Sequence, residues 1–120
     1  MQNAPGSQYE KVIKGSQMFM KIQYCGGWGY RPKVTQFINK IEDGQFKESI
    51  SYYLLKDPGT TGNFECTIYK QPNCQGEGTL VFSKQASKVF PYADDAAWNE
   101  MIAKIEACKW ANEGLTKRAK

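Results

Sequence analysis

The sequence predicts one α+β domain built on a four-stranded mixed β-sheet, with its elements in the order β-α-β-β-β-α. Four segments in which apolar and polar residues alternate, and two segments with an apolar stripe of helical period, lead to this prediction. The chain has 120 residues, 41% of them hydrophobic and 23% charged, which suits a single soluble domain and leaves no room for a second core.

The folded domain is expected over residues 18–112. Residues 1–17 are rich in Gln, Ser, Gly and Lys, and we expect a flexible leader there. Residues 113–120 are polar and end in basic residues, so we expect a flexible basic tail. Within the domain, residues 18–24 alternate between two faces and predict the first strand, and a glycine-rich loop follows it at once.

A helix is predicted directly after this loop. Pro32 suits the first turn, where its missing N–H costs nothing, and Gly44 supplies a stop. Between them, apolar residues recur at the i, i+3, i+4 and i+7 spacing of a helix face that packs on a core. These residues are Val34, Phe37, Ile38 and Ile41.

Three further strands and a second helix follow. The strands are predicted over residues 49–55 and 64–69 and around residues 80–82, with Asp57-Pro58-Gly59 as a turn after the first of them. Asp94 or Asp95 caps the second helix, whose stripe comprises Trp98, Met101, Ile102, Ile105 and Cys108. We expect the first two strands to be parallel through a right-handed crossover and the last three to form a meander. This order is a thioredoxin-like arrangement.

The composition excludes several kinds of chemistry. The chain has no histidine, so Ser-His and Cys-His catalysis are impossible, and its cysteines lack the spacing of zinc ligands. A net charge of +4 with scattered lysines predicts no specific nucleic-acid site. No apolar run is long enough for a membrane span or a signal peptide. We therefore expect a cytoplasmic monomer whose four cysteines, Cys25, Cys66, Cys74 and Cys108, stay reduced.

The glycine-rich loop carries a resemblance. Residues 24–33, YCGGWGYRPK, followed by an amphipathic helix, resemble the redox loop of the selenoprotein W (Rdx) family, in which C-x-x-U or C-x-x-C precedes Gly-Tyr and a basic helix start. Residues 58–65, PGTTGNFE, are similar to the family's Thr-Gly-x-Phe-Glu strand entry. A looser match is LVFSK at residues 80–84, with Phe90-Pro91 and the Trp98 helix behind it.

The resemblance runs from about Met20 to Cys108 and implies a thioredoxin-like fold. It also implies a glutathione-linked thiol or selenol oxidoreductase. Glutathione is then the reductant, and glutathione or protein thiols and adaptor proteins of the 14-3-3 kind are the expected partners. A cytoplasmic location follows in the same way, and no metal is implied.

Cys25 takes the place of the family's motif cysteine and is the candidate redox thiol. The thiolate is the reactive form of cysteine, and nearby positive charge or a helix N-terminus lowers the thiol pKa. Flexible glycines allow the loop to fold back toward such groups. The residues that we expect to support the thiolate are Gly26, Gly27, Gly29, Arg31 and Lys33.

Trp28 occupies the position of selenocysteine or the second cysteine, and an indole cannot form a disulfide. Three interpretations stay open. The native codon is UGA and specifies selenocysteine; or the protein is a monothiol that glutathione resolves; or catalysis is lost and the Gly26-Gly27-Trp28-Gly29 loop serves a non-catalytic interaction module. Enzyme activity is accordingly left undecided by the sequence.

The other cysteines receive structural interpretations. Cys66 shares a strand face with Phe64 and Ile68, and Cys108 extends the stripe of the second helix, so both are expected to be buried. Cys74 lies in the polar loop of residues 71–78 and is expected to be exposed.

Overall fold

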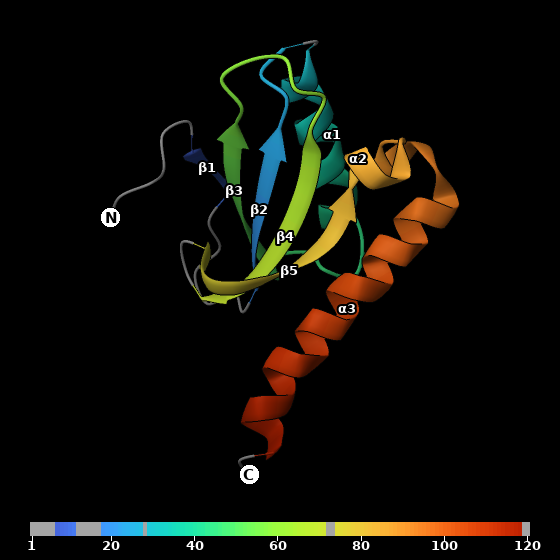
Figure 1. The fold of residues 1–120 in the computed structure, drawn as a ribbon. Coiled ribbons are helices and arrows are strands. Elements are labelled where there is room, and N and C mark those ends of the chain that lie inside the picture. Colours follow the sequence, from blue (N-terminus) through green and yellow to red (C-terminus); the bar gives the residue numbers. More distant parts are fainter. Residues whose placement is uncertain (1–6, 12–17, 28, 72–73, 119–120) are drawn as a thin grey trace.

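The computed structural model describes residues 7–11, 18–27, 29–71 and 74–118, and for residues 7–11, 75 and 110–118 the backbone alone (Figure 1). It contains one mixed sheet in the order β1-β3-β2-β4-β5. The strands are β1 (Ser7–Lys11), β2 (Met18–Tyr24), β3 (Ile50–Lys56), β4 (Phe64–Gln71) and β5 (Gln75–Ser83). The helices are α1 (Tyr30–Glu42), α2 (Lys84–Ser87), the 3₁₀ turn η2 (Pro91–Ala93) and α3 (Asp95–Arg118).

The predicted α+β class is confirmed, with β2 to β5 as the four predicted strands of a mixed sheet. In α1 the predicted stripe is buried, and Val34 and Phe37 have no exposed surface. Asp94 caps α3, since its carboxylate accepts a hydrogen bond of 2.8 Å from the amide of Ala97. Among the described residues, no helix combines the length and apolarity that crossing a membrane requires.

The expected leader contains a strand, which corrects the prediction for residues 7–11. β1 pairs antiparallel with β3 and forms an edge of the sheet, with Ser7 opposite Leu55 and Tyr9 opposite Tyr53. The short polar segment SQYEK has little strand signal of its own, and it becomes a strand because β3 presents an unpaired edge. The rest of the expected leader lies outside the described residues.

The C-terminal helix is longer than expected. We expected the folded domain to end at residue 112, whereas α3 continues through Arg118 and runs past the end of the sheet (Figure 1). Each residue added to an existing helix gains one backbone hydrogen bond, so a polar segment extends a helix that is already nucleated.

The predicted meander is wrong. β2 and β3 are parallel neighbours as expected, but β4 pairs antiparallel with β2 and not with β3. Alternation identifies strands without identifying their partners, and β2 takes the central position of the sheet. The β3–β4 connection, residues 57–63, therefore has to pass across the end of β2, where Cys25 lies.

The core lies between one face of the sheet and the two long helices. Aromatic rings join these layers: the ring of Phe37 in α1 lies 5.2 Å from that of Phe64 in β4 and 5.9 Å from that of Trp98 in α3. Phe90, just before η2, continues the cluster with a ring distance of 5.5 Å to Phe64. This aromatic cluster fixes α1, and with it the loop that precedes α1, on the sheet.

Candidate functional site

Cys25 follows the last residue of β2, and two backbone hydrogen bonds tie it to the β3–β4 connection. The amide of Cys25 donates to the carbonyl of Asn63 at 2.9 Å, and the amide of Gly26 donates to the carbonyl of Gly59 at 2.9 Å. The loop after β2 and the connection therefore form one unit, although they are distant in sequence.

Glycines permit this close approach. A Cβ on Gly26 would lie 2.1 Å from the carbonyl oxygen of Asp57, and one on Gly27 would lie 2.4 Å from Oγ1 of Thr60. Gly29 serves as the N-cap of α1 with φ of 66°, a left-handed conformation that glycine adopts without strain. A steric or conformational reason thus explains why each of these three loop positions holds glycine.

The sulfur of Cys25 is surrounded by donors. The amide of Gly27 lies 3.4 Å from Sγ and the amide of Thr61 lies 3.3 Å from it. Burial is the strongest influence on this thiol and by itself raises its pKa. The amides of Gly62, Gly27 and Thr61 and the hydroxyl of Thr61 act against burial, and the pKa of Cys25 is held below its ordinary value.

The same enclosure limits access to the thiol. Cys25 is 1% exposed. A disulfide therefore reaches Sγ only when the surrounding loop moves. Cys25 therefore has a stabilised thiolate that is also covered by the surrounding loop.

The pKa values of the other three cysteines are raised. All four are free thiols. Burial, followed by the charge of Glu65, raises the pKa of Cys66; burial raises that of Cys108. Cys74, expected to be exposed, is half-buried, and burial raises its pKa to about 12. Cys25 alone among the four has a lowered pKa.

The two basic residues expected to support the thiolate have other contacts. The guanidinium of Arg31 donates to the hydroxyl of Thr35 at 2.8 Å, and the ammonium of Lys33 lies 5.2 Å from the ring centroid of Phe90. Neither belongs to the groups that shift the pKa of Cys25. Backbone amides are the main groups that lower the pKa of Cys25. Trp28, the remaining candidate, lies outside the described residues.

Asp57 organises the connection, and sequence reasoning missed this. It is 7% exposed, and its carboxylate accepts hydrogen bonds from Nε2 of Gln23 at 2.8 Å, from Nδ2 of Asn63 at 2.9 Å and from the hydroxyl of Thr61. Burial opposes its ionisation most strongly, yet these three donors hold the pKa of Asp57 below its ordinary value. Asp before Pro-Gly is ordinary turn chemistry, so no signal in the sequence distinguishes this carboxylate.

The connection is also held from α2. Nε2 of Gln85 donates to the carbonyl of Thr61 at 3.3 Å and to Oδ1 of Asn63 at 2.9 Å. Glu65 in turn holds the start of α2, because its carboxylate accepts from the amide of Lys84 at 2.9 Å. The residues that donate to Cys25 are thus fixed from two sides.

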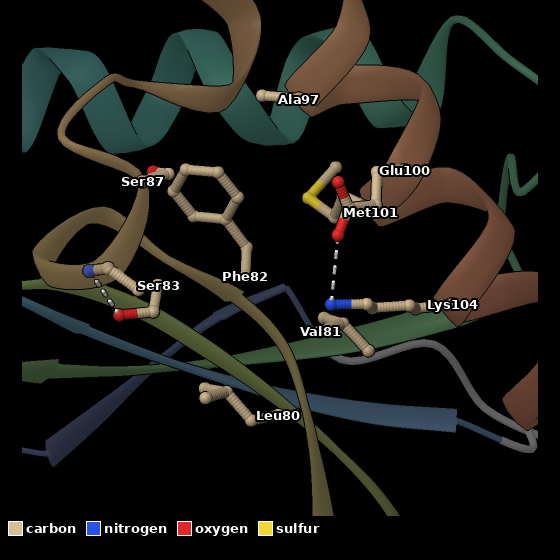
Figure 2. Close-up of a pocket in the computed structure, with 10 residues that line it drawn as sticks. Leu80, Val81, Phe82, Ser83, Ser87, Ala97, Glu100, Met101 and Lys104 are labelled. Atoms are coloured by element: carbon tan, nitrogen blue, oxygen red, sulfur yellow. Dashed lines mark hydrogen bonds and ion pairs between the residues drawn. The ribbon is translucent and has the colours of Figure 1, made fainter.

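Two cavities lined by described residues lie away from Cys25. One of about 340 Å³ lies between β5, α2 and α3. Figure 2 shows Phe82 and Met101 beside it, with an ion pair of 3.4 Å between Lys104 and Glu100. Cys25 does not line it. Within the described ranges, no group of cysteines and carboxylates could hold a metal ion.

Together, the fold and this site define a thioredoxin-like α+β protein with one thiol of lowered pKa at the end of its central strand. The Rdx family model matches residues 19–97, and the chain belongs to the Rdx family. Selenoprotein W of Ovis aries is 30% identical over 89 residues, which cover 73% of this chain and 90% of that protein. Selenoprotein W of Danio rerio is 32% identical over 82 residues, covering 68% and 85%. β1 precedes the matched segment, and most of α3 follows it.

Proposed function

We propose that this protein catalyses thiol–disulfide exchange with glutathione as the reductant, and that Cys25 is the reacting thiol. One observation carries the proposal: among four free cysteines, Cys25 alone has its pKa lowered, by amide donors from two separate segments. The thiolate is the nucleophile in such exchange, so the lowered pKa increases the reactive fraction at neutral pH. Membership of the Rdx family supports the same chemistry.

The reaction needs only one protein thiol. The thiolate of Cys25 attacks the glutathione sulfur of a mixed disulfide, forms a Cys25–glutathione disulfide and releases the substrate as a thiolate, which takes up a proton. A second glutathione thiolate then attacks the glutathione sulfur on Cys25, so that glutathione disulfide leaves and Cys25 returns as a thiolate. In the net reaction the glutathionylated substrate and one free glutathione give the reduced substrate thiol and glutathione disulfide.

The amides of Gly27 and Thr61 have a defined part in this cycle. They stabilise negative charge on Sγ at 3.4 and 3.3 Å, both in the attacking thiolate and when Cys25 is the leaving group. We place this chemistry in the cytoplasm, where glutathione keeps thiols reduced.

The test compares Cys25→Ser with the wild-type protein on a glutathionylated peptide, with glutathione and a coupled glutathione reductase that reports glutathione disulfide. Wild type turns over and Cys25→Ser does not. Cys74→Ser is the matched control, because that thiol has a raised pKa and its loss leaves the rate unchanged. Turnover by Cys25→Ser at the wild-type rate overturns the proposal. Absence of turnover in the wild type and in both variants also overturns it, and favours the non-catalytic interaction module.

The identity of residue 28 decides how the mixed disulfide is resolved. A UGA codon in the native transcript, with selenium in the intact mass, places a selenol three residues after Cys25, and that selenol resolves the intermediate. A tryptophan codon leaves resolution to glutathione.

A further inference from the structure

Two lysines from different helices lie over one aromatic ring. Nζ of Lys33 in α1 lies 5.2 Å from the ring centroid of Phe90, and Nζ of Lys84 in α2 lies 5.3 Å from it. The ammonium of Lys84 also lies 5.8 Å from the ring of Tyr30, which packs edge-on against Phe90 at 5.2 Å. We call Lys33, Lys84, Tyr30 and Phe90 the lysine–aromatic patch.

The charge of this patch is not neutralised within the described part of the chain. A ring attracts a cation without cancelling its charge, and no carboxylate of the described residues lies within ion-pair distance of Lys33 or Lys84. Two carboxylates of the site are held by internal donors. Asp57 accepts from three side chains, and Glu65 accepts from the start of α2. Both ammonium groups thus remain available to an external anion.

The patch adjoins the Cys25 site through two contacts. The amide of Tyr30 donates to the carbonyl of Gly27 at 3.4 Å, and Gly27 donates in turn to the sulfur. The side chain of Gln85, next to Lys84, donates to the carbonyl of Thr61, whose amide is the second donor to the sulfur. Tyr30 of the patch and Gln85, the neighbour of Lys84, therefore contact the two residues whose amides donate to the sulfur.

We propose that the lysine–aromatic patch binds the carboxylates of the compound that reacts at Cys25, so that the protein selects small anionic disulfides of the glutathione type over neutral or cationic ones. The nature of the reaction rests on the proposed function, whereas the attraction of anions to Cys25 does not. Carboxylates on the patch hold the disulfide beside the thiolate. The sulfur bond made and the sulfur bond broken are those of the exchange already described.

The first experiment measures the attraction without any turnover. Cys25 is alkylated at low ionic strength with iodoacetate, an anion, and with iodoacetamide, its neutral counterpart, and the modified peptide is quantified by mass spectrometry. The ratio of the two rate constants cancels differences in thiolate fraction and in loop opening. In Lys33→Gln/Lys84→Gln this ratio falls about three- to fivefold, and added salt removes the difference from wild type.

A matched control separates local from general charge. Lys40 has the same kind of contact, 4.6 Å from the ring of Trp98, but lies about two helical turns further along α1, and Lys47 is exposed beyond the end of that helix. Lys40→Gln/Lys47→Gln removes the same charge and keeps the wild-type ratio. An unchanged ratio in Lys33→Gln/Lys84→Gln, or an equal fall in the control, overturns the inference.

The second experiment uses disulfides. Wild-type protein is reacted with glutathione disulfide, which is anionic, and with cystamine, which is cationic, and the mixed disulfide on Cys25 is followed by intact mass. Wild type favours glutathione disulfide, and Lys33→Gln/Lys84→Gln loses this preference. If the preference exists while the coupled assay shows no turnover, the proposed function fails and the patch stands. If turnover occurs without this preference, the proposed function stands and the inference about the lysine–aromatic patch fails.

Discussion

The backbone amide of Thr61 lies 3.3 Å from the sulfur of Cys25, although 36 positions separate the two residues in the sequence. The contact exists because the β3–β4 connection crosses the end of β2 on its way to the other side of that strand. The lowered pKa of the thiol therefore depends on the order of strands in the sheet as well as on the loop that contains Cys25.

The hydroxyl of Thr61 is expected to tune the thiol. It lowers the pKa of Cys25 and donates its single hydrogen to Asp57, so it cannot serve both groups at once and its effect on the thiol is moderate. Thr61→Val removes the hydroxyl and keeps the amide. We expect alkylation of Cys25 at pH 7 to slow about three- to tenfold, with the half-maximal pH shifted upward. Thr61→Ser keeps the wild-type profile. Equal pH profiles for Thr61→Val and wild type would contradict this role.

Gly26 is expected to tolerate no side chain. The Cβ of Gly26→Ala would lie 2.1 Å from a backbone oxygen, so the two segments must separate. We expect the free energy of unfolding, measured with urea, to fall by about 3 kcal/mol or more. Gly59→Ala is the control in the facing connection, because its Cβ meets nothing within 4 Å, and it should change stability by less than about 0.5 kcal/mol. Equal losses in the two variants would show that Gly26 is not sterically required.

Asp57 is expected to stabilise the fold above acid pH. Asp57→Ala leaves three donors without their acceptor and should lower the free energy of unfolding by about 2–4 kcal/mol at pH 7. Because the folded-state pKa is lowered, this contribution is present above the unfolded pKa of about 3.9 and is lost as the pH falls through the folded value. Urea unfolding at several pH values measures the difference from wild type.

The control for Asp57 is Asp43→Ala. Asp43 is exposed at the end of α1, and its removal should change stability by less than about 0.5 kcal/mol at pH 7. A difference between wild type and Asp57→Ala that stays constant down to pH 2 would contradict the ionised state of Asp57 in the fold.

Cys66 is expected to give the opposite pH dependence. Burial raises its pKa, so its contribution is fully present below the unfolded pKa of about 8.5 and is lost as the pH rises toward the folded value. Cys66→Ala should cost about 1–3 kcal/mol at pH 7. That cost should shrink by up to about 1.4 kcal/mol per pH unit above the unfolded pKa. Urea unfolding at pH 7 and 9.5 tests this. An equal cost at both pH values would mean that folding does not raise the pKa of Cys66.

Much of the fold could be predicted because its elements have local signals. The stripe from Val34 to Ile41 specifies α1, and the alternation in β2 and β4 specifies strands, since one face of each must be buried. Strand pairing has no such local signal. Nothing in β3 or β4 states that β4 lies beside β2, and the polar β1 became a strand only because β3 had a free edge.

The site divides in the same way. Cys25 and its glycines stand in one short stretch whose resemblance to a family marks them. The donors at Thr61 and Gly62 and the carboxylate of Asp57 come from a distant segment, so their relation to Cys25 depends on the sheet. Arg31 and Lys33 follow Cys25 closely in the sequence, yet the helix directs them to Thr35 and Phe90.

The crossing of the β3–β4 connection over β2 has a consequence for the protein during its synthesis. The ribosome releases Cys25 well before residues 61 and 62, so the emerging chain carries a cysteine without those donors. Until β4 has joined β2, this thiol has the nucleophilicity of any unfolded cysteine. The chain therefore acquires the lowered pKa of Cys25, and the cover over its sulfur, only when the sheet is complete.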